Sequence, residues 1–337
     1  MKSSVVTIKD IAEKLKVSPS TVSRALGNHP RIGLKMRMQV QALAREMGYE
    51  PNSQAISFKQ KRTSIIGVIL PFIREDFFSS AISAIEMAAI AQDYTILFGQ
   101  SLDDPEQEKK IVAAMKKQRV DGLIISLSKY TVNYDHLQSL HKYGIPVVYF
   151  DRVPPFKAAH KVFCNMHRGT VQMVNWLLAA KHRRIALING PDSLPASKER
   201  LTGYMEALSK KQIKVDMQLV ETTDLSTEQT SEAMARLLRL KKPPTAIISF
   251  NDYVHMDAAR YALQHGVKVN EDIIFASYAN LPVTSYIAFP PAASLEQFPF
   301  RQGEKAMELI IRAMHEEQSD DFYTEEILPE LVFSTNK

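Results

Sequence analysis

Residues 7–26, TIKDIAEKLKVSPSTVSRAL, contain the start and stop signals of two short helices. Thr7 and Asp10 form a capping-box pattern, and the helix dipole favours the acidic side chain in the first turn. After a two-residue connection, Ser18 can cap the next helix, and Pro19 suits its first position because that position needs no N–H donor. The stretch therefore predicts a helix-turn-helix.

The second of these helices has one apolar side and one polar side. Its polar side carries short hydroxyl side chains and one arginine, namely Ser20, Thr21, Ser23 and Arg24. Hydroxyls can reach phosphates or bases, and arginine can pair with two acceptors of guanine in the major groove. Capped helix pairs also occur as purely structural elements, so the periodicity alone leaves DNA binding and a structural role open.

The distribution of charge favours DNA binding. Residues 1–62 hold twelve Lys and Arg against four Asp and Glu, a net charge of +8, whereas the remainder holds 30 against 33, a net charge of −3. A basic head on a mildly acidic body is typical of a nucleic-acid-binding domain, whose affinity falls with salt.

The overall composition predicts a chain of two or three domains with ordinary cores. It has 337 residues, of which 45% are hydrophobic. The first residues contain no apolar run of the signal-peptide kind, and no later segment has eighteen uncharged apolar residues, so we expect a cytoplasmic protein with no membrane partner. The single Cys164 excludes an internal disulfide and a cysteine-based zinc site, and we expect it to be a small buried hydrophobe.

A third helix and a polar linker follow the helix-turn-helix. Residues 34–47 repeat apolar side chains at helical spacing. The core-facing stripe consists of Met36, Val40, Leu43 and Met47. The linker at 51–62 contains Ile56 and Phe58 beside lysines and an arginine, a combination that suits insertion into the minor groove of DNA.

Beyond the linker, short β-branched strands alternate with helices in two successive units. In the first unit we expect strands at 65–71, 94–99, 120–126 and 145–150 and helices at 78–92, 105–118 and 134–143. In the second we expect strands at 184–190, 217–222, 245–250 and 273–278 and helices at 168–180, 197–210, 227–240 and 253–265. Continuous apolar strands indicate parallel sheets that are buried on both faces.

A ligand of such a two-lobed body is expected at the carboxyl ends of the strands. The segments that follow those ends are 71–78, 151–152, 190–200, 250–252 and 278–280. We therefore expect them to line a cleft between the lobes.

Head, linker and body together resemble the LacI/GalR family of bacterial transcription regulators. Besides residues 7–26, the family-like segments are GYEPN at 48–52, TSIIGVILP at 63–71, VDGLIIS at 120–126, GIPVVYFDR at 144–152, HRRIALI at 182–188, ERLTGYMEAL at 199–208 and PPAASLEQFP at 290–299. The resemblance implies an all-α helix-turn-helix head at 1–50, a hinge helix or linker at 51–62 and an α/β body at 63–337. The body would resemble periplasmic binding proteins, with two parallel-sheet subdomains: an N-lobe of about 63–160 plus 292–325 and a C-lobe of about 161–291 plus 326–337.

The same resemblance implies a sequence-specific regulator of transcription, expected to be a repressor. It would bind double-stranded, pseudo-palindromic operator DNA as a homodimer or as a pair of dimers, under the control of a sugar or sugar derivative held between the lobes. No cofactor, metal site or catalytic residue is implied.

The family pattern assigns DNA contacts to the head and linker. Base-reading positions are occupied by Pro19, Ser20 and Arg24, and phosphate-contacting or adjoining positions by Thr7, Ser18, Thr21 and Ser23. Ala55 and Phe58 fall where the hinge would enter the minor groove. The usual wedge is leucine rather than Phe58, and Ile56 replaces the usual arginine.

Five positions match residues that contact effectors in family members: Phe77, Asp151, Arg200, Asn251 and Asp252. Their side chains offer an aromatic face, hydroxyl acceptors and a bidentate cation. The family commonly has a carboxylate where this chain has Ala279, and Cys164 replaces a frequent aspartate. These departures allow a uronate, an oligosaccharide or another ligand that depends less on hydroxyl contacts.

Two other function classes stay open at this point. A small-molecule binding protein of the periplasmic sugar-receptor kind would share the two-lobed body, although the basic head argues against it. An enzyme would need a catalytic motif, and the sequence has no phosphate-binding glycine loop, no His-Glu-x-x-His and no Gly-x-Ser-x-Gly. His167, His182 and His255 are scattered, so we expect them to be structural rather than zinc ligands.

Overall fold

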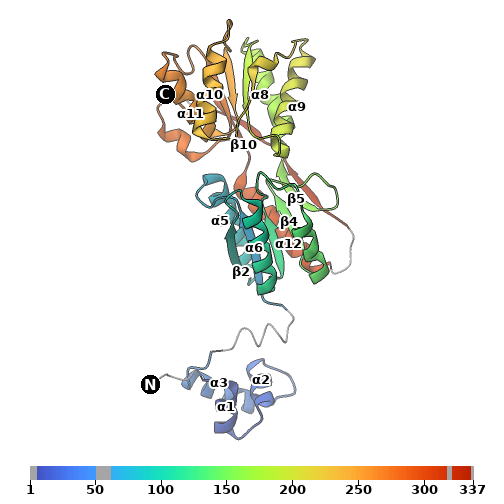
Figure 1. Ribbon diagram of the computed structural model, residues 1–337. Coiled ribbons are helices and arrows are strands. Elements are labelled where there is room, and N and C mark those ends of the chain that lie inside the picture. The colour runs from blue at the N-terminus through green and yellow to red at the C-terminus, as the bar shows by residue number, and fades with distance from the viewer. Residues whose placement is uncertain (1–5, 51–61, 317–320, 335–337) are drawn as a thin grey trace. The chain divides into compact units, whose positions relative to one another are not determined.

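A computed structural model describes residues 6–50, 62–316 and 321–334 (Figure 1). The chain divides into two compact units, Met1–Thr63 and Ser64–Lys337, called here the head and the body. Ala55 and Phe58, the expected hinge contacts, lie outside the described residues.

The head consists of three helices, α1 (Ile8–Leu15), α2 (Pro19–Leu26) and α3 (Leu34–Glu46). The expected capping box at the start of α1 is confirmed, and the carboxylate of Asp10 accepts hydrogen bonds from the Thr7 backbone N–H at 2.7 Å and from its hydroxyl at 2.8 Å. Ser18 caps α2 by accepting from the N–H of Thr21 at 3.1 Å, and Pro19 occupies the first helical position. Local sequence signals therefore set both ends of the helix-turn-helix.

A small apolar cluster holds the three helices together. Its fully buried members are Ile11, Ala12, Val22, Ala25, Val40 and Ala44. Met36, Leu43 and Met47 of the expected stripe pack against this cluster while remaining half-buried. Because so many of the buried side chains are alanines, the helices can approach closely in so small a domain.

The body contains two six-stranded sheets, each flanked by helices. The N-lobe sheet has the order β11-β5-β4-β3-β1-β2, and all of its neighbouring strands are parallel. Its strands are β1 (Ile65–Leu70), β2 (Thr95–Gln100), β3 (Gly122–Ile125), β4 (Val147–Phe150), β5 (His160–Cys164) and β11 (Thr324–Ile327). Its helices are α5 (Asp76–Ile90), α6 (Pro105–Gln118), α7 (Asp135–Gln138) with a 3-10 turn at Ser139–Tyr143, and α12 (Pro299–His315).

The C-lobe sheet has the order β12-β10-β9-β8-β6-β7, in which only the β10–β12 pair is antiparallel. Its strands are β6 (Ile185–Asn189), β7 (Val220–Thr222), β8 (Ala246–Ser249), β9 (Ile274–Ala279), β10 (Ala293–Glu296) and β12 (Glu330–Phe333). Its helices are α8 (Met166–Ala179), α9 (Pro195–Lys210), α10 (Thr227–Leu238) and α11 (Asp252–Gln264), with 3-10 turns at Met217–Leu219 and Pro282–Tyr286.

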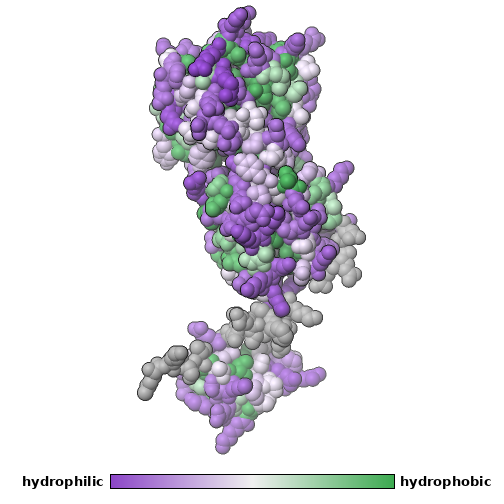
Figure 2. Space-filling view, in the orientation of Figure 1, coloured by the Kyte–Doolittle hydropathy of each residue, from purple (hydrophilic) through white to green (hydrophobic). Residues whose placement is uncertain are grey.

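The helices cover both faces of each sheet, which is why the strands are continuously apolar. One buried cluster includes side chains of α5 and α12 in the N-lobe and of α8 and α9 in the C-lobe. Separate clusters lie under α6 and α7 and under α10 and α11. On the face drawn in Figure 2, hydrophilic side chains dominate the surface of both lobes. Within the described residues, no helix is long and apolar enough to cross a membrane.

The lobe boundaries expected from the sequence need correction. β5 belongs to the N-lobe sheet although we placed 161–291 in the C-lobe, and β10 belongs to the C-lobe sheet although we placed 292–325 in the N-lobe. The described chain thus passes between the lobes just after Cys164, between Glu296 and Pro299, and between Ile327 and Glu330 (Figure 1). Strand pairing between distant segments decides these crossings, and hydrophobic periodicity does not report it.

Candidate functional site: an exposed helix and an interlobe cleft

The candidate DNA-contacting residues of the head gather at the start of α2. The hydroxyl of Ser18 lies 2.8 Å from that of Ser20 and 2.9 Å from that of Thr21, so three hydroxyls form one cluster. Ser18, Pro19 and Ser20 are exposed, whereas Thr21 is half-buried. The cluster lies at a helix N-terminus, where backbone N–H groups and the positive end of the dipole favour anions.

Arg24 is exposed one turn further along α2, and Ser23 beside it is half-buried. The helix has no acidic residue in its first turn, and Arg24 lies in its last turn. Thr7 lies at the start of α1, where its hydroxyl is used by Asp10, and these hydrogen bonds lower the pKa of that carboxyl. The Arg24 side chain is therefore open to solvent, and Thr7 helps to fix the start of the first helix.

Between the lobes of the body lies a pocket, and each of the five segments expected to line the cleft contributes to it. From those segments come Glu75, Phe77, Phe78, Asp151, Arg152, Leu194, Pro195, Ala196, Glu199, Arg200, Phe250, Asn251 and Ala279. The sequence reasoning did not assign Val153, Phe163, Met166, Tyr253, Leu281 and Gln297 to it, and it treated Cys164 only as a departure from the family. Phe163, Cys164 and Met166 were missed because β5 was not recognised as a strand of the N-lobe.

Arg200, from α9, is the most unusual polar group in the pocket. It is only 3% exposed, and its guanidinium carbon lies 3.9 Å from the ring centre of Phe250 and 4.3 Å from that of Tyr278. Its Nε and Nη1 atoms are buried and have no hydrogen-bond partner among the described residues. Burial lowers the pKa of the guanidinium, and the Tyr278 hydroxyl and the charges of Asp151 and Glu199 oppose this effect.

The rings of Phe250 and Tyr278 both lie within cation–π distance of the guanidinium. A buried donor without a partner is costly, and an acceptor supplied by a ligand would remove that cost.

Three carboxyl groups also line the pocket, and burial is the main cause that raises the pKa of each. They belong to Glu75, Asp151 and Glu199. The charge of Arg152 opposes the effect at Glu75 and Asp151. Asp151 sits directly after β4 in the left-handed region, at a φ of 57°, which turns the chain sharply at the pocket wall. Such carboxyl groups are suited to accept hydrogen bonds from hydroxyls or to bind a cationic group.

Phe77 and Asn251 lie in the pocket, as the sequence predicted. The Phe77 ring meets that of Phe78 edge-on, with 5.3 Å between the ring centres. Asn251 precedes α11, and its side-chain oxygen accepts the Val254 N–H at 2.9 Å. Its oxygen is therefore already engaged as a helix cap, while the residue still faces the pocket.

Asp252, unlike the other four expected effector contacts, is not among the residues that line the pocket. It is fully buried, and its carboxylate accepts the Leu281 N–H at 2.6 Å and the hydroxyls of Ser277 and Ser294, the latter at 3.3 Å. Burial raises the pKa of Asp252 to about 6, and these hydrogen bonds limit the rise. The carboxylate therefore ties α11 to β10 and to the chain after β9.

The missing carboxylate at Ala279 leaves an apolar wall at this point of the pocket. Ala279 has a φ of 94°, which is unusual for a residue with a β-carbon, and the buried Tyr278 beside it shares a 2.7 Å hydrogen bond with Thr170. Burial raises the pKa of the Cys164 thiol, so Cys164 is a weakly reactive apolar lining residue.

The histidines discussed above have structural partners. His255 is fully buried, and its Nε2 lies 2.9 Å from the carbonyl oxygen of Phe289. His182 lies 3.1 Å from the Thr245 hydroxyl, and His167 lies 3.0 Å from a carboxylate oxygen of Glu206. Within the described part of the chain, no three His, Cys, Asp or Glu side chains are grouped so that they could hold a metal ion.

Two family models match this chain. Residues 7–52 match the bacterial regulatory proteins of the lacI family, and residues 63–326 match the periplasmic binding proteins and sugar binding domain of the LacI family. The second match covers more than half of the chain and includes the whole described pocket.

Named relatives agree with these matches. The HTH-type transcriptional repressor CytR of Escherichia coli is 32% identical over 91% of this chain and 89% of its own length, and the ribose operon repressor of Bacillus subtilis is 30% identical over 91% of both. Among solved structures, the transcription regulator CcpA of Lactococcus lactis has a TM-score of 0.73 at 27% identity and covers 80% of this chain and 97% of its own. A lac repressor dimer bound to operator has a TM-score of 0.83 and covers 98% of each chain, and at 24% identity it shows the shared fold. The chain therefore belongs to the LacI family of DNA-binding transcription regulators.

Proposed function

We propose that this regulator is a repressor whose affinity for its operator is set by a small molecule bound between the lobes. The observation that carries the proposal is the buried Arg200 guanidinium, whose Nε and Nη1 atoms lack partners among the described residues at the pocket wall. A ligand that supplies acceptors to these donor atoms can favour one arrangement of the lobes over another.

The head would read the operator with the polar side of α2. Exposed Pro19, Ser20 and Arg24 would meet base edges, and Thr7, Ser18, Thr21 and Ser23 would contact or support contacts to phosphates. Ala55 and Phe58 would enter the minor groove from the hinge. Two heads are needed for a pseudo-palindromic site, which is the reason to propose a homodimer, with a pair of dimers as the larger assembly.

The effector would be a sugar or sugar derivative that depends little on hydroxyl contacts at one end. Phe77 offers an aromatic face to a ring of the ligand. Arg200 would donate hydrogen bonds to paired acceptor atoms of the ligand, and the carboxyl groups would accept hydrogen bonds from its hydroxyls. Where Ala279 and Cys164 line the pocket, the ligand would present few hydroxyl groups, since neither side chain is a strong hydrogen-bond acceptor. The name of the ribose operon repressor supports a sugar, and a uronate or an oligosaccharide would suit the substitutions.

We also propose that the chain acts by binding and not by catalysis, in the cytoplasm where operator DNA lies. Its named relatives are transcriptional repressors, which supports this role.

The first experiment is selection of bound genomic fragments by the full chain and by residues 63–337 alone, at about physiological salt, where non-specific phosphate binding is weak. We expect the full chain alone to enrich one palindromic site, and the neighbouring genes then indicate the effector. If neither protein enriches a site, the head is a structural domain, and small-molecule binding by the body becomes the main function.

A further inference from the structure

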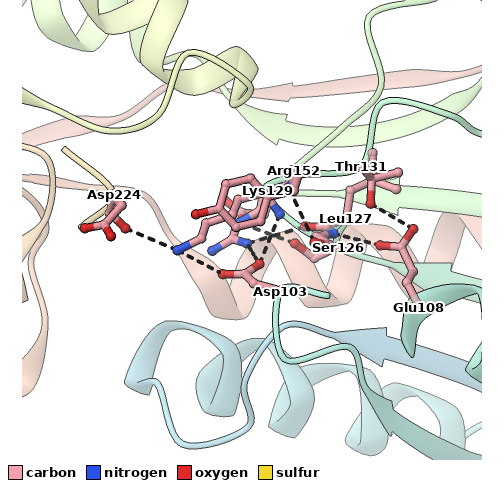
Figure 3. A network of polar contacts seen from close by, with 11 residues as sticks. Asp103, Glu108, Ser126, Leu127, Lys129, Thr131, Arg152 and Asp224 are labelled. Carbon is pink, nitrogen blue, oxygen red and sulfur yellow. Dashed lines mark hydrogen bonds and ion pairs between the residues drawn. The ribbon is translucent and has the colours of Figure 1, made fainter. Parts of the chain in front are cut away.

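A polar network beside the pocket connects the two lobes (Figure 3). Its centre is Asp103, which follows β2 and is only 8% exposed. One oxygen of its carboxylate accepts Nη1 of Arg152 at 2.5 Å and the backbone N–H of Lys129 at 3.0 Å. Asp103 therefore holds both the Arg152 side chain, which follows β4, and the loop after β3.

That loop is held to the N-lobe by a second buried carboxylate. Glu108 of α6 accepts the backbone N–H of Ser128 at 2.7 Å and the Thr131 hydroxyl at 3.1 Å, and a ring nitrogen of His136 lies 2.9 Å away. The side chain of Glu108 is fully buried. Because its carboxylate holds both sides of Lys129, this lysine extends from a firmly anchored loop.

The Lys129 side chain crosses to the C-lobe. Its Nζ donates to the backbone carbonyl oxygen of Asp224, just after β7, at 3.2 Å, while the second carboxylate oxygen of Asp103 lies 3.9 Å away. The lysine side chain is 17% exposed. Asp224 is fixed in its own turn, since its N–H donates to Gln229 at 2.9 Å and its carboxylate accepts the Ser226 N–H at 2.8 Å.

We propose that Lys129 is a latch between the lobes, which holds the cleft closed by binding the Asp224 carbonyl. The ammonium group lies within reach of two acceptors, Asp103 on its own lobe and Asp224 on the other, and only the second acceptor joins the lobes. When the ammonium group turns fully to Asp103, the lobes lose this contact.

Arg152 links the latch to the pocket. It lines the pocket and is hydrogen-bonded to Asp103. Asp103 therefore joins a residue of the pocket to the latch. The latch rests on the proposed function, because it assigns to Lys129 the closure of the same pocket that would hold the effector.

The latch can be tested on the full chain without DNA or ligand, using Cys164 as a reporter. Cys164 is the only cysteine, it is buried, and it lines the pocket, so the rate of its alkylation by iodoacetamide measures how often the cleft opens. In Lys129→Met we expect alkylation to be roughly tenfold faster, the effect of losing one charged hydrogen bond. Lys129→Arg, which can still donate to the carbonyl, should react at nearly the wild-type rate.

The matched control is Lys109→Met on α6, since Lys109 pairs with Glu106 of the same helix at 2.6 Å and does not join the lobes. It should leave the rate unchanged. Fluorescence of the single Trp176 checks that each variant is folded, and Lys129→Gln replaces the methionine variant if that one unfolds. Equal rates in the wild type and in a folded neutral variant would overturn the latch. This readout is independent of operator binding, so its failure differs from a failure of the proposed function.

Discussion

The head and the cleft differ in how their candidate contact residues are exposed to water. In the head, the candidate contacts lie within residues 7–26, and Ser18, Ser20 and Arg24 are exposed to water. In the cleft, contacts come from five distant segments, and Arg200 is buried with two donor atoms lacking partners among the described residues. The exposed site costs the fold little, whereas the buried site is stable only because the surrounding core outweighs its desolvation.

The sharpest test of this contrast is Arg200→Met. Removing the cation should weaken effector binding by about 2–5 kcal/mol, because a desolvated charge is lost from the ligand contact. The free protein should become no less stable, since an apolar side chain of similar length removes two buried donor atoms that have no hydrogen-bond partner among the described residues.

Arg168→Met, at an exposed arginine of α8, should change neither quantity. Calorimetry with the identified effector and urea unfolding measure the two effects. A variant that loses stability and still binds the effector would show that Arg200 is a structural residue.

Burial in the body also predicts that its stability depends on pH. Burial lowers the pKa of His255 to about 4, so the folded state keeps it neutral while the unfolded chain is protonated below about pH 6.5. Its contribution to stability is therefore present above pH 6.5 and is lost as the pH falls toward 4, by up to about 3 kcal/mol. Asp252 acts in the opposite direction, because its raised pKa favours the folded state as the pH falls below about 6.

His255→Gln isolates the histidine, since Asp252 is common to both proteins. The difference in unfolding free energy between the wild type and this variant should change between pH 6.5 and 4, as followed by Trp176 fluorescence. His141→Gln, at an exposed histidine, is the control and should show no such change. A constant difference across this range would contradict the neutral buried state of His255.

In the head, Arg24→Ala should weaken binding to the selected operator by about 1–3 kcal/mol per head and relax the preference at one base pair. Stability should stay within about 0.5 kcal/mol of the wild type because the side chain is exposed. Titrations against operators with single base-pair changes measure the preference. Arg45→Ala on α3 is the control, and an equal loss of preference in both variants would place base reading elsewhere.

The smallest expected effect concerns the cap of α2. Ser18→Ala removes the acceptor for the Thr21 N–H and should destabilise the head by about 1 kcal/mol. Ser23→Ala, inside the same helix, should cost clearly less. Thermal unfolding followed by circular dichroism compares the two variants. Equal losses of stability would show that the Ser18 cap does not stabilise the head.

How much of the molecule could be predicted varies with the range of the interactions. The helix-turn-helix was predictable because each capping group and its partner are three residues apart, as Thr7 and Asp10 are. Most strands and helices up to residue 278 were predictable because the spacing of apolar residues within each element is also a local property of the sequence. One local error is the region expected as one helix at 134–143, which is a four-residue α-helix followed by a 3-10 turn. The expectation also named no element where the structure has β5, β10, α12, β11 and β12.

The sequence by itself determined the helix-turn-helix, the basic head and the strand ends that meet in the cleft, since these follow from residue spacing and local hydrogen bonds. Only the tertiary structure decided that Asp252 binds the Leu281 N–H instead of facing the pocket, and that Lys129 reaches the carbonyl of Asp224. It also decided that β5 and β10 exchange the lobes we expected for them. In each case the partner lies far away in the chain, and a carboxylate, an ammonium group or a strand edge has the same local pattern whichever distant partner it meets.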